Sequence, residues 1–145
     1  MPNSDAVLDF RIPPQPHLCR AVRNGVAEFA RSHGVGESDL SALLTALGEA
    51  LVNAIEHAQG SDAIEIECRI GAGRIVATVQ DRGAGCASDD FAQASFPEGL
   101  AERGRGVPIM RHCTDIFSVR SFPGKGTAVV LGRFLREAAN CAFGF

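Results

Sequence analysis

The sequence contains no tryptophan and no tyrosine, whereas glycine is frequent, with 16 residues in 145. Turns therefore outnumber aromatic anchors, although the 46% hydrophobic and 21% charged fractions are those of a globular protein. No run approaches the roughly 18 apolar residues that cross a bilayer. Residues 1–11 contain two aspartates and lack the basic-then-apolar order of a signal peptide. We expect a cytoplasmic protein that does not contact a membrane.

A concentrated positive charge is also missing. The 14 basic residues are scattered singly except around Arg103 and Arg105, and the net charge is −3. No basic stripe is available to neutralise a run of phosphates. This distribution argues against DNA or RNA as a partner.

The cysteines lack the spacing that is typical of a disulfide framework or of a metal site. There are five, an odd number, and none forms a Cys-x-x-Cys pair. This pattern argues against a set of disulfides and against a thiolate zinc site. The four histidines are too dispersed to indicate a metal cluster.

The length of 145 residues, without a linker, predicts a single domain over residues 1–145 with a core at about 8–133. Alternating residues predict a strand over Val7–Ile12, which the proline-rich residues 13–16 end. Helical spacing predicts a first helix over about Leu18–Ser32, stopped by Gly34.

A second, longer helix carries the strongest periodic signal, and Ser38 or Asp39 is placed to cap it. Its apolar residues recur at helical spacing: Leu40, Leu43, Leu44, Leu47, Leu51, Ala54, Ile55 and Ala58. Alternation over Ile64–Ile70 and over Arg74–Gln80, with a glycine-containing turn between them, predicts an antiparallel hairpin.

The next segment, residues 82–103, is rich in small and polar residues and shows neither the helical nor the strand periodicity of apolar residues. A loop this long in a compact domain calls for a functional reason. Beyond it, the pattern predicts a short helix over Val107–His112 and strands over Ile116–Phe122 and Thr127–Phe134.

Two polar residues of the long helix, Glu49 and Asn53, are four residues apart and therefore share a face. A lone glutamate on a helix is more often simply solvated. Here, however, no lysine or arginine occurs between Leu40 and Ala58. The residues flanking Glu49 on that face are small or uncharged: Ala42, Thr45, Ala46 and Val52. We interpret this face as leaving room for a magnesium–nucleotide complex, with the Asn53 carbonyl oxygen as a metal ligand and Glu49 as a candidate general base.

Three glycine-rich turns follow. Asp81 ends a predicted strand, where its carboxylate can accept a hydrogen bond from an exocyclic amine, and Gly83 and Gly85 let the backbone approach a ligand. Taken alone, such a turn is equally typical of plain chain reversal. Gly104 and Gly106 enter a helix, whose backbone N–H groups suit a phosphate.

The third turn, Gly124–Thr127, is like the end of a P-loop. It lacks the earlier glycine of that motif and leads into a strand rather than a helix. A Walker-type nucleotide site is therefore rejected.

Taken in order, Glu49–His57, Asp81–Gly85, Gly104–Gly106 and Gly124–Thr127 resemble the N, G1, G2 and G3 boxes of the GHKL ATPase superfamily. The sequence of residues 47–57 is most similar to that of the anti-sigma-factor serine/threonine kinases. The resemblance covers about residues 8–133. It implies a Bergerat-type ATP-binding fold of the α/β class, an α+β two-layer sandwich with a mixed, mainly antiparallel sheet and helices on one face.

The resemblance also implies roles for residues. Glu49 would be the catalytic base, Asn53 the Mg²⁺ ligand, Asp81 the partner of the adenine amino group and Thr127 a further adenine contact. The loop at 82–103 would close over the phosphates. The remaining ATP-binding set implied by the motifs is Gly83, Gly85, Arg103, Gly104, Arg105, Gly106, Val107 and Gly126.

By the same resemblance, the protein would phosphorylate a STAS-type anti-anti-sigma partner, control a sigma factor or a substitute target, and form a homodimer. One alternative is an ATP-binding module that regulates its partners by contact without phosphotransfer. Another is the catalytic half of a histidine kinase, which we rank last because no helical hairpin with a phospho-acceptor histidine precedes the long helix.

Overall fold

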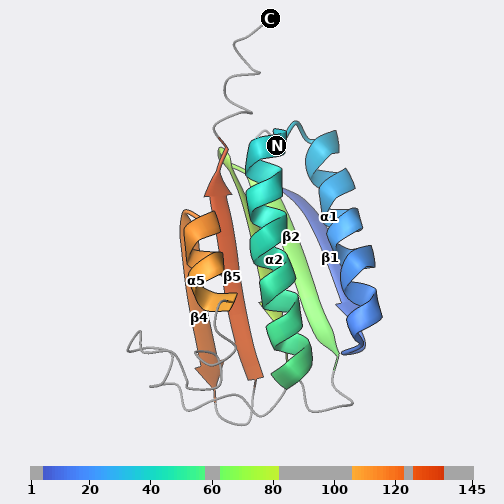
Figure 1. Ribbon diagram of the computed structural model, residues 1–145. Helices are drawn as coiled ribbons and strands as arrows, with labels where there is room; N and C mark the ends of the chain where they lie inside the picture. The colour runs from blue at the N-terminus through green and yellow to red at the C-terminus, as the bar shows by residue number, and fades with distance from the viewer. Residues whose placement is uncertain (1–4, 58–62, 82–105, 123–125, 136–145) are drawn as a thin grey trace, which may run out of the picture.

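The computed structural model describes residues 5–57, 63–81, 106–122 and 126–135. Figure 1 shows a sheet with the helices laid across one of its faces. The elements in chain order are β1 (Ala6–Ile12), a 3-10 turn (Pro16–Leu18), α1 (Cys19–Ser32), α2 (Glu37–His57), β2 (Ile64–Gly71), β3 (Arg74–Gln80), α5 (Gly106–Cys113), β4 (Ile116–Phe122) and β5 (Gly126–Phe134).

The five described strands form one sheet in the order β1-β2-β3-β5-β4. Each neighbouring pair is antiparallel. The predicted α+β two-layer sandwich, with helices on one face, is confirmed (Figure 1). A mixed, mainly antiparallel sheet was expected. Among the described strands, every neighbouring pair is antiparallel.

The alternation that predicted the hairpin separates the two faces of the sheet. In β2, Ile64, Ile66 and Cys68 are buried on the face toward the helices, and the intervening residues are more exposed. Burial and, to a smaller extent, the nearby Glu67 carboxylate together raise the pKa of the Cys68 thiol to about 12. This cysteine is therefore a protonated, apolar part of the core, as the isolated spacing of the cysteines indicated.

The hairpin turn between β2 and β3 is as tight as the sequence predicts. Gly71 pairs with Arg74, which leaves two residues in the loop. Both have positive φ, 55° at Ala72 and 77° at Gly73. This is the backbone that matches the twist of the flanking strands, and glycine adopts it at little cost.

The long helix α2 lies between α1 and α5 over the middle of the sheet (Figure 1). Eight of its residues are buried. By length and composition it is also apolar enough to cross a membrane. That is weak evidence for a membrane, because the buried core helix of a globular domain meets the same criterion.

The start of α2 differs from the prediction. The helix begins at Glu37, and the N–H of Leu40 donates to the carbonyl oxygen of Gly36. Ser38 and Asp39 therefore lie inside the first turn and do not precede it as caps. Asp39 is only 1% exposed, because its carboxylate is paired with Arg133 from the far end of the chain. Buried carboxylates usually need such a partner.

Candidate functional site

The predicted site residues that the structure describes lie toward one end of the sandwich. The C-terminal end of α2, drawn in green, lies at the same end of the molecule as the end of β4 and the start of β5 (Figure 1). The register places the last residue of β3, Gln80, opposite Ala128 near the start of β5. This arrangement brings together segments that are far apart in the sequence.

Asp81 and Thr127 meet at this end. The backbone N–H of Asp81 donates to the carbonyl oxygen of Thr127 at 2.9 Å, which continues the β3–β5 pairing by one step. Asp81 is 3% exposed, and Thr127 is half-buried. Both continue the alternation of Val79 and Val129, so they lie on the face of the sheet that the helices cover.

Ser121 is a third member of this group, and the sequence analysis missed it. It is 2% exposed, and its Oγ lies 3.1 Å from Oγ1 of Thr127. The two residues are opposite each other in the β4–β5 register. The predicted strands over 116–122 and 127–134, joined by a short glycine-rich turn, would have revealed this pairing if they had been read as a hairpin.

Gly126 opens β5 beside this group with φ of 97°. Side chains other than glycine rarely adopt this backbone conformation. The glycine thus allows β5 to begin immediately before Thr127.

Glu49 and Asn53 both lie on α2 and are both partly exposed. The interpretation of their surroundings is wrong at one position. Ala46 is fully buried and does not border an open face. Both α1 and α5 pack against α2. More of the surface of α2 is therefore covered than a single apolar stripe implies. Thr45 and Val52 are exposed, as expected of a free face.

Arg23 of α1 lies against α2 just before Glu49. A Cβ on Gly48 would be 3.7 Å from the Nε atom of Arg23, an ordinary van der Waals contact, so this guanidinium lies close over the helix at Gly48. Arg31 of the same helix is instead engaged with Glu37, with its Nε 2.8 Å from Oε2. The arginines of α1 therefore have different surroundings, which their spacing does not reveal.

His57, the last residue of α2, is one turn beyond Asn53. Its Nε2 atom is buried and has no hydrogen-bond partner within the described part of the chain. A buried ring nitrogen normally donates or accepts a hydrogen bond, depending on its tautomer. This nitrogen can therefore accept or donate one further bond, such as one to a bound polar group.

The N-terminus of α5 supplies backbone N–H groups. The helix begins at Gly106, Val107 is 2% exposed, and Pro108 follows in the first turn. The first N–H groups of a helix have no intrahelical acceptor and attract anions. The sequence predicts a phosphate-binding role at Gly106, and the family resemblance places Val107 in the ATP-binding set.

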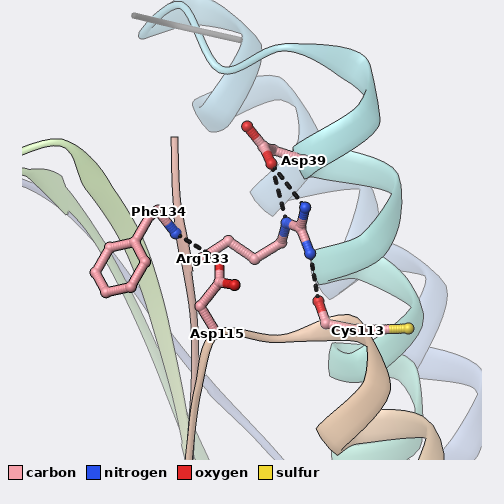
Figure 2. Close-up of polar contacts among 5 residues, drawn as sticks. All are labelled: Asp39, Cys113, Asp115, Arg133 and Phe134. Atoms are coloured by element: carbon pink, nitrogen blue, oxygen red, sulfur yellow. Dashed lines mark hydrogen bonds and ion pairs between the residues drawn. The ribbon is translucent and has the colours of Figure 1, made fainter. Parts of the chain in front are cut away.

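The C-terminal end of α5 is fixed by Arg133 of β5 (Figure 2). Its Nε and Nη2 atoms donate to Oδ1 of Asp39 at 3.0 and 2.9 Å. Its Nη1 donates to the carbonyl oxygen of Cys113 at 2.9 Å. In the next strand position, the N–H of Phe134 donates to Oδ2 of Asp115 at 2.9 Å. We call the contacts of Asp39, Arg133 and Cys113 the arginine bridge; it joins the start of α2 to the end of α5.

Several predicted residues lie outside the described part of the chain. They belong to the loop at 82–103, which was expected to close over phosphates, and to the turn that follows it. The site residues concerned are Gly83, Gly85, Arg103, Gly104 and Arg105.

A hollow of about 510 Å³ lies on the other face of the sheet. It is open to solvent and carries three carboxylates and one guanidinium. Its lining residues are Asp9, Phe10, Arg11, Glu65, Ile66, Glu67, Thr78 and Gln80. Because Glu49, Asp81 and Thr127 are on the helix-covered side, this hollow is not part of the predicted site.

Residues 12–133 match the family of histidine kinase-like ATPase domains. The chain belongs to this family. Since these are ATPase domains, membership implies that the chain binds a nucleotide. The matched range includes each of the four boxes found in the sequence.

Two relatives of this ATPase domain are each named anti-sigma F factor. The one from Pasteuria penetrans is 32% identical over 128 residues, which cover 83% of this chain and 85% of the relative. The one from Oceanobacillus iheyensis is 30% identical over 123 residues, covering 80% and 84%. The similarity to proteins of this name thus extends over most of both chains.

Solved structures share the fold. The RsbU and RsbW domains of a Mycobacterium tuberculosis protein match with a TM-score of 0.68 and 20% identity over 90% of this chain, which spans about a third of that longer chain (32%). The SiaB–SiaC complex from Pseudomonas aeruginosa matches with a TM-score of 0.61 and 12% identity, covering 86% of this chain and 88% of that one. At these identities the likeness concerns the fold alone.

Proposed function

We propose that this single domain is a magnesium- and ATP-dependent serine/threonine protein kinase that acts as an anti-sigma regulatory factor in the cytoplasm. The observation that carries the proposal is the convergence of Asp81 and Thr127 at the end of the sandwich where the Glu49-bearing half of α2 lies. The relatives named anti-sigma F factor support the regulatory part.

The described residues fit a magnesium–nucleotide complex. Asp81 has a buried carboxylate at the end of a strand. The first amides of α5 are at the opposite end of that helix from the arginine bridge. Nε2 of His57 is buried and has no hydrogen-bond partner among the described residues. Asn53 offers an amide oxygen, a ligand type that Mg²⁺ accepts. When bound, the ion would neutralise charge on the phosphates.

Each residue then has a role. Asp81 accepts a hydrogen bond from the adenine amino group, and Thr127 supports the base directly or through water. Asn53 holds the ion, and the N–H groups of Gly106 and Val107 bind phosphate oxygens. Glu49 accepts the proton of the partner's serine hydroxyl while a new bond forms between the serine oxygen and the γ-phosphorus; the bond to the bridging oxygen breaks, and ADP leaves.

The proposed protein substrate is a STAS-type anti-anti-sigma partner. Phosphorylation of this partner would lower its affinity for this chain. The chain would then be able to bind a sigma factor or a substitute target. Such partner switching needs two mutually exclusive complexes, one of which is controlled by a phosphate.

Incubation with Mg-ATP and candidate STAS proteins, read by intact mass, tests the kinase. We expect the mass of one partner to increase by a single phosphate, with no increase if Mg²⁺ is chelated. ADP binding without transfer to any candidate would favour the regulatory module that acts by contact alone. Failure to bind ADP or ATP at all would contradict the proposed function.

We further propose a homodimer formed through the face of the sheet opposite the helices. A row of paired residues crosses this face from Val7 through Arg69, Val76 and Gly132 to Ile116. A Cβ on Gly132 would be 3.0 Å from Cδ1 of Ile116 and 3.2 Å from Cγ2 of Val76, so the two apolar side chains nearly meet over the glycine. Within the described residues no helix covers them (Figure 1).

The change Val7→Glu should weaken the dimer by about tenfold, because it places a further charge beside Arg69, where association must remove it from water. Val7 is 41% exposed, so the monomer tolerates the change. Light scattering across a concentration series measures the association. Val52→Glu is the matched control, since Val52 is 48% exposed but lies on α2. A wild-type protein that is monomeric at all concentrations would contradict the proposal.

A further inference from the structure

Ser121 is a buried hydroxyl that the proposed mechanism does not use. It lies at the end of β4, on the helix-covered face, and is 2% exposed. Burying a hydroxyl is costly unless it is hydrogen-bonded. Its Oγ is 3.1 Å from Oγ1 of Thr127, the residue opposite it in β5. We propose that Ser121 is a positioning residue that sets the hydroxyl of Thr127 for recognition of an adenine base.

The geometry supports this role because Thr127 is fixed from two sides. Its carbonyl oxygen accepts a hydrogen bond from the backbone N–H of Asp81 at 2.9 Å, which fixes the backbone of Thr127 relative to that of Asp81. Its side chain is bonded to Ser121. Whichever hydroxyl donates, the bond selects one χ1 rotamer of Thr127, a β-branched residue with few rotamers. The three residues thus hold the hydroxyl of Thr127 in a fixed position relative to the backbone of Asp81, whose carboxylate is buried at the same strand end.

A carboxylate and a hydroxyl held in this way discriminate between purines. Adenine presents an amino group that donates to a carboxylate. Guanine presents a carbonyl oxygen at the same ring position, and this oxygen would face the carboxylate of Asp81 without a shared hydrogen. Loss of Ser121 frees the hydroxyl of Thr127, which weakens the adenine contact and leaves guanine binding as poor as before.

This inference rests on the proposed nucleotide binding, so both are tested in one titration. The affinities of the full chain for ADP and for GDP, each with magnesium, are measured by calorimetry. In Ser121→Ala we expect the affinity for ADP to fall by about 3- to 10-fold, the effect of one hydrogen bond. The affinity for GDP stays unchanged, so the ADP-to-GDP selectivity falls by the same factor.

A double-mutant cycle separates positioning from general support of the fold. Thr127→Val removes the hydroxyl and keeps the shape of the side chain. If Ser121 acts through Thr127, then Ser121→Ala has no further effect on ADP affinity in the Thr127→Val background. Ser118→Ala is the control, because Ser118 is on the same strand but, by alternation, on the opposite face.

Some outcomes would overturn the inference alone. These are a wild-type-like ADP affinity in Ser121→Ala, an equal loss of ADP and GDP affinity, or the same loss with and without the Thr127 hydroxyl. A wild-type chain that binds neither nucleotide would overturn the proposed function together with this inference. If Ser121→Ala does not fold, Ser121→Cys keeps a weak hydrogen-bonding group of similar shape and should give an intermediate loss.

Discussion

Replacing Glu49 with glutamine should slow phosphoryl transfer to the partner's serine by about 10²- to 10⁴-fold, the usual contribution of a general base. The amide keeps the shape of the side chain but cannot take up the serine proton. ADP affinity should change by less than about twofold, since base catalysis acts on the transition state rather than on nucleotide binding. Single-turnover transfer and ADP titration measure the two effects separately.

The matched control for this substitution is Glu37→Gln. It removes the same charge from the same helix, at the end far from the site. Glu37 is exposed, and its ion pair with Arg31 is a surface contact, which contributes little. Transfer at the wild-type rate by the Glu49 variant would eliminate Glu49 as the base, although the chain would still be a kinase.

Replacing Asp39 with alanine should lower the free energy of unfolding by about 3 kcal/mol, because it leaves the guanidinium of Arg133 without its buried carboxylate. The side chains of Asp39 and Arg133 are only 2% and 16% exposed, so water replaces little of the lost contact. Urea denaturation followed by circular dichroism measures the change.

A double variant, Asp39→Leu with Arg133→Met, tests the reason for that loss. If the cost comes from an unpaired buried charge, removing both charges recovers part of the stability lost in Asp39→Ala. Glu37→Ala, which breaks an exposed pair on the same helix, should leave the denaturation curve nearly unchanged. Coincident curves for wild type and Asp39→Ala would show that the arginine bridge contributes nothing measurable.

The secondary structure could be predicted from the sequence because it depends on local patterns. Alternation defined β2 and β3, and Gly73 marked the turn between them. Helical spacing located α2, although its start was displaced. Asp39 was placed before the helix because an aspartate at that position is typical of a cap, and no local signal shows that its partner is Arg133, at the other end of the chain.

The site was only partly accessible from the sequence for the same reason. Glu49 and Asn53 share a helix face, so spacing alone relates them. Asp81 and Thr127 could be related only through family motifs, because their contact depends on the order of β3 and β5 in the sheet. Ala46 was misplaced because helical spacing does not show that α5 covers a second side of α2.

The arginine bridge has a further consequence for how the proposed phosphate site can open. Arg133 joins the end of α5 to the start of α2, at the opposite end of α5 from Gly106. A movement of α5 that keeps this contact is a rotation pivoting at Cys113. With eight residues, the helix is about 12 Å long, so its first amides travel farthest in such a rotation. Such a rotation would give the largest displacement to the end of α5 that is proposed to bind phosphate.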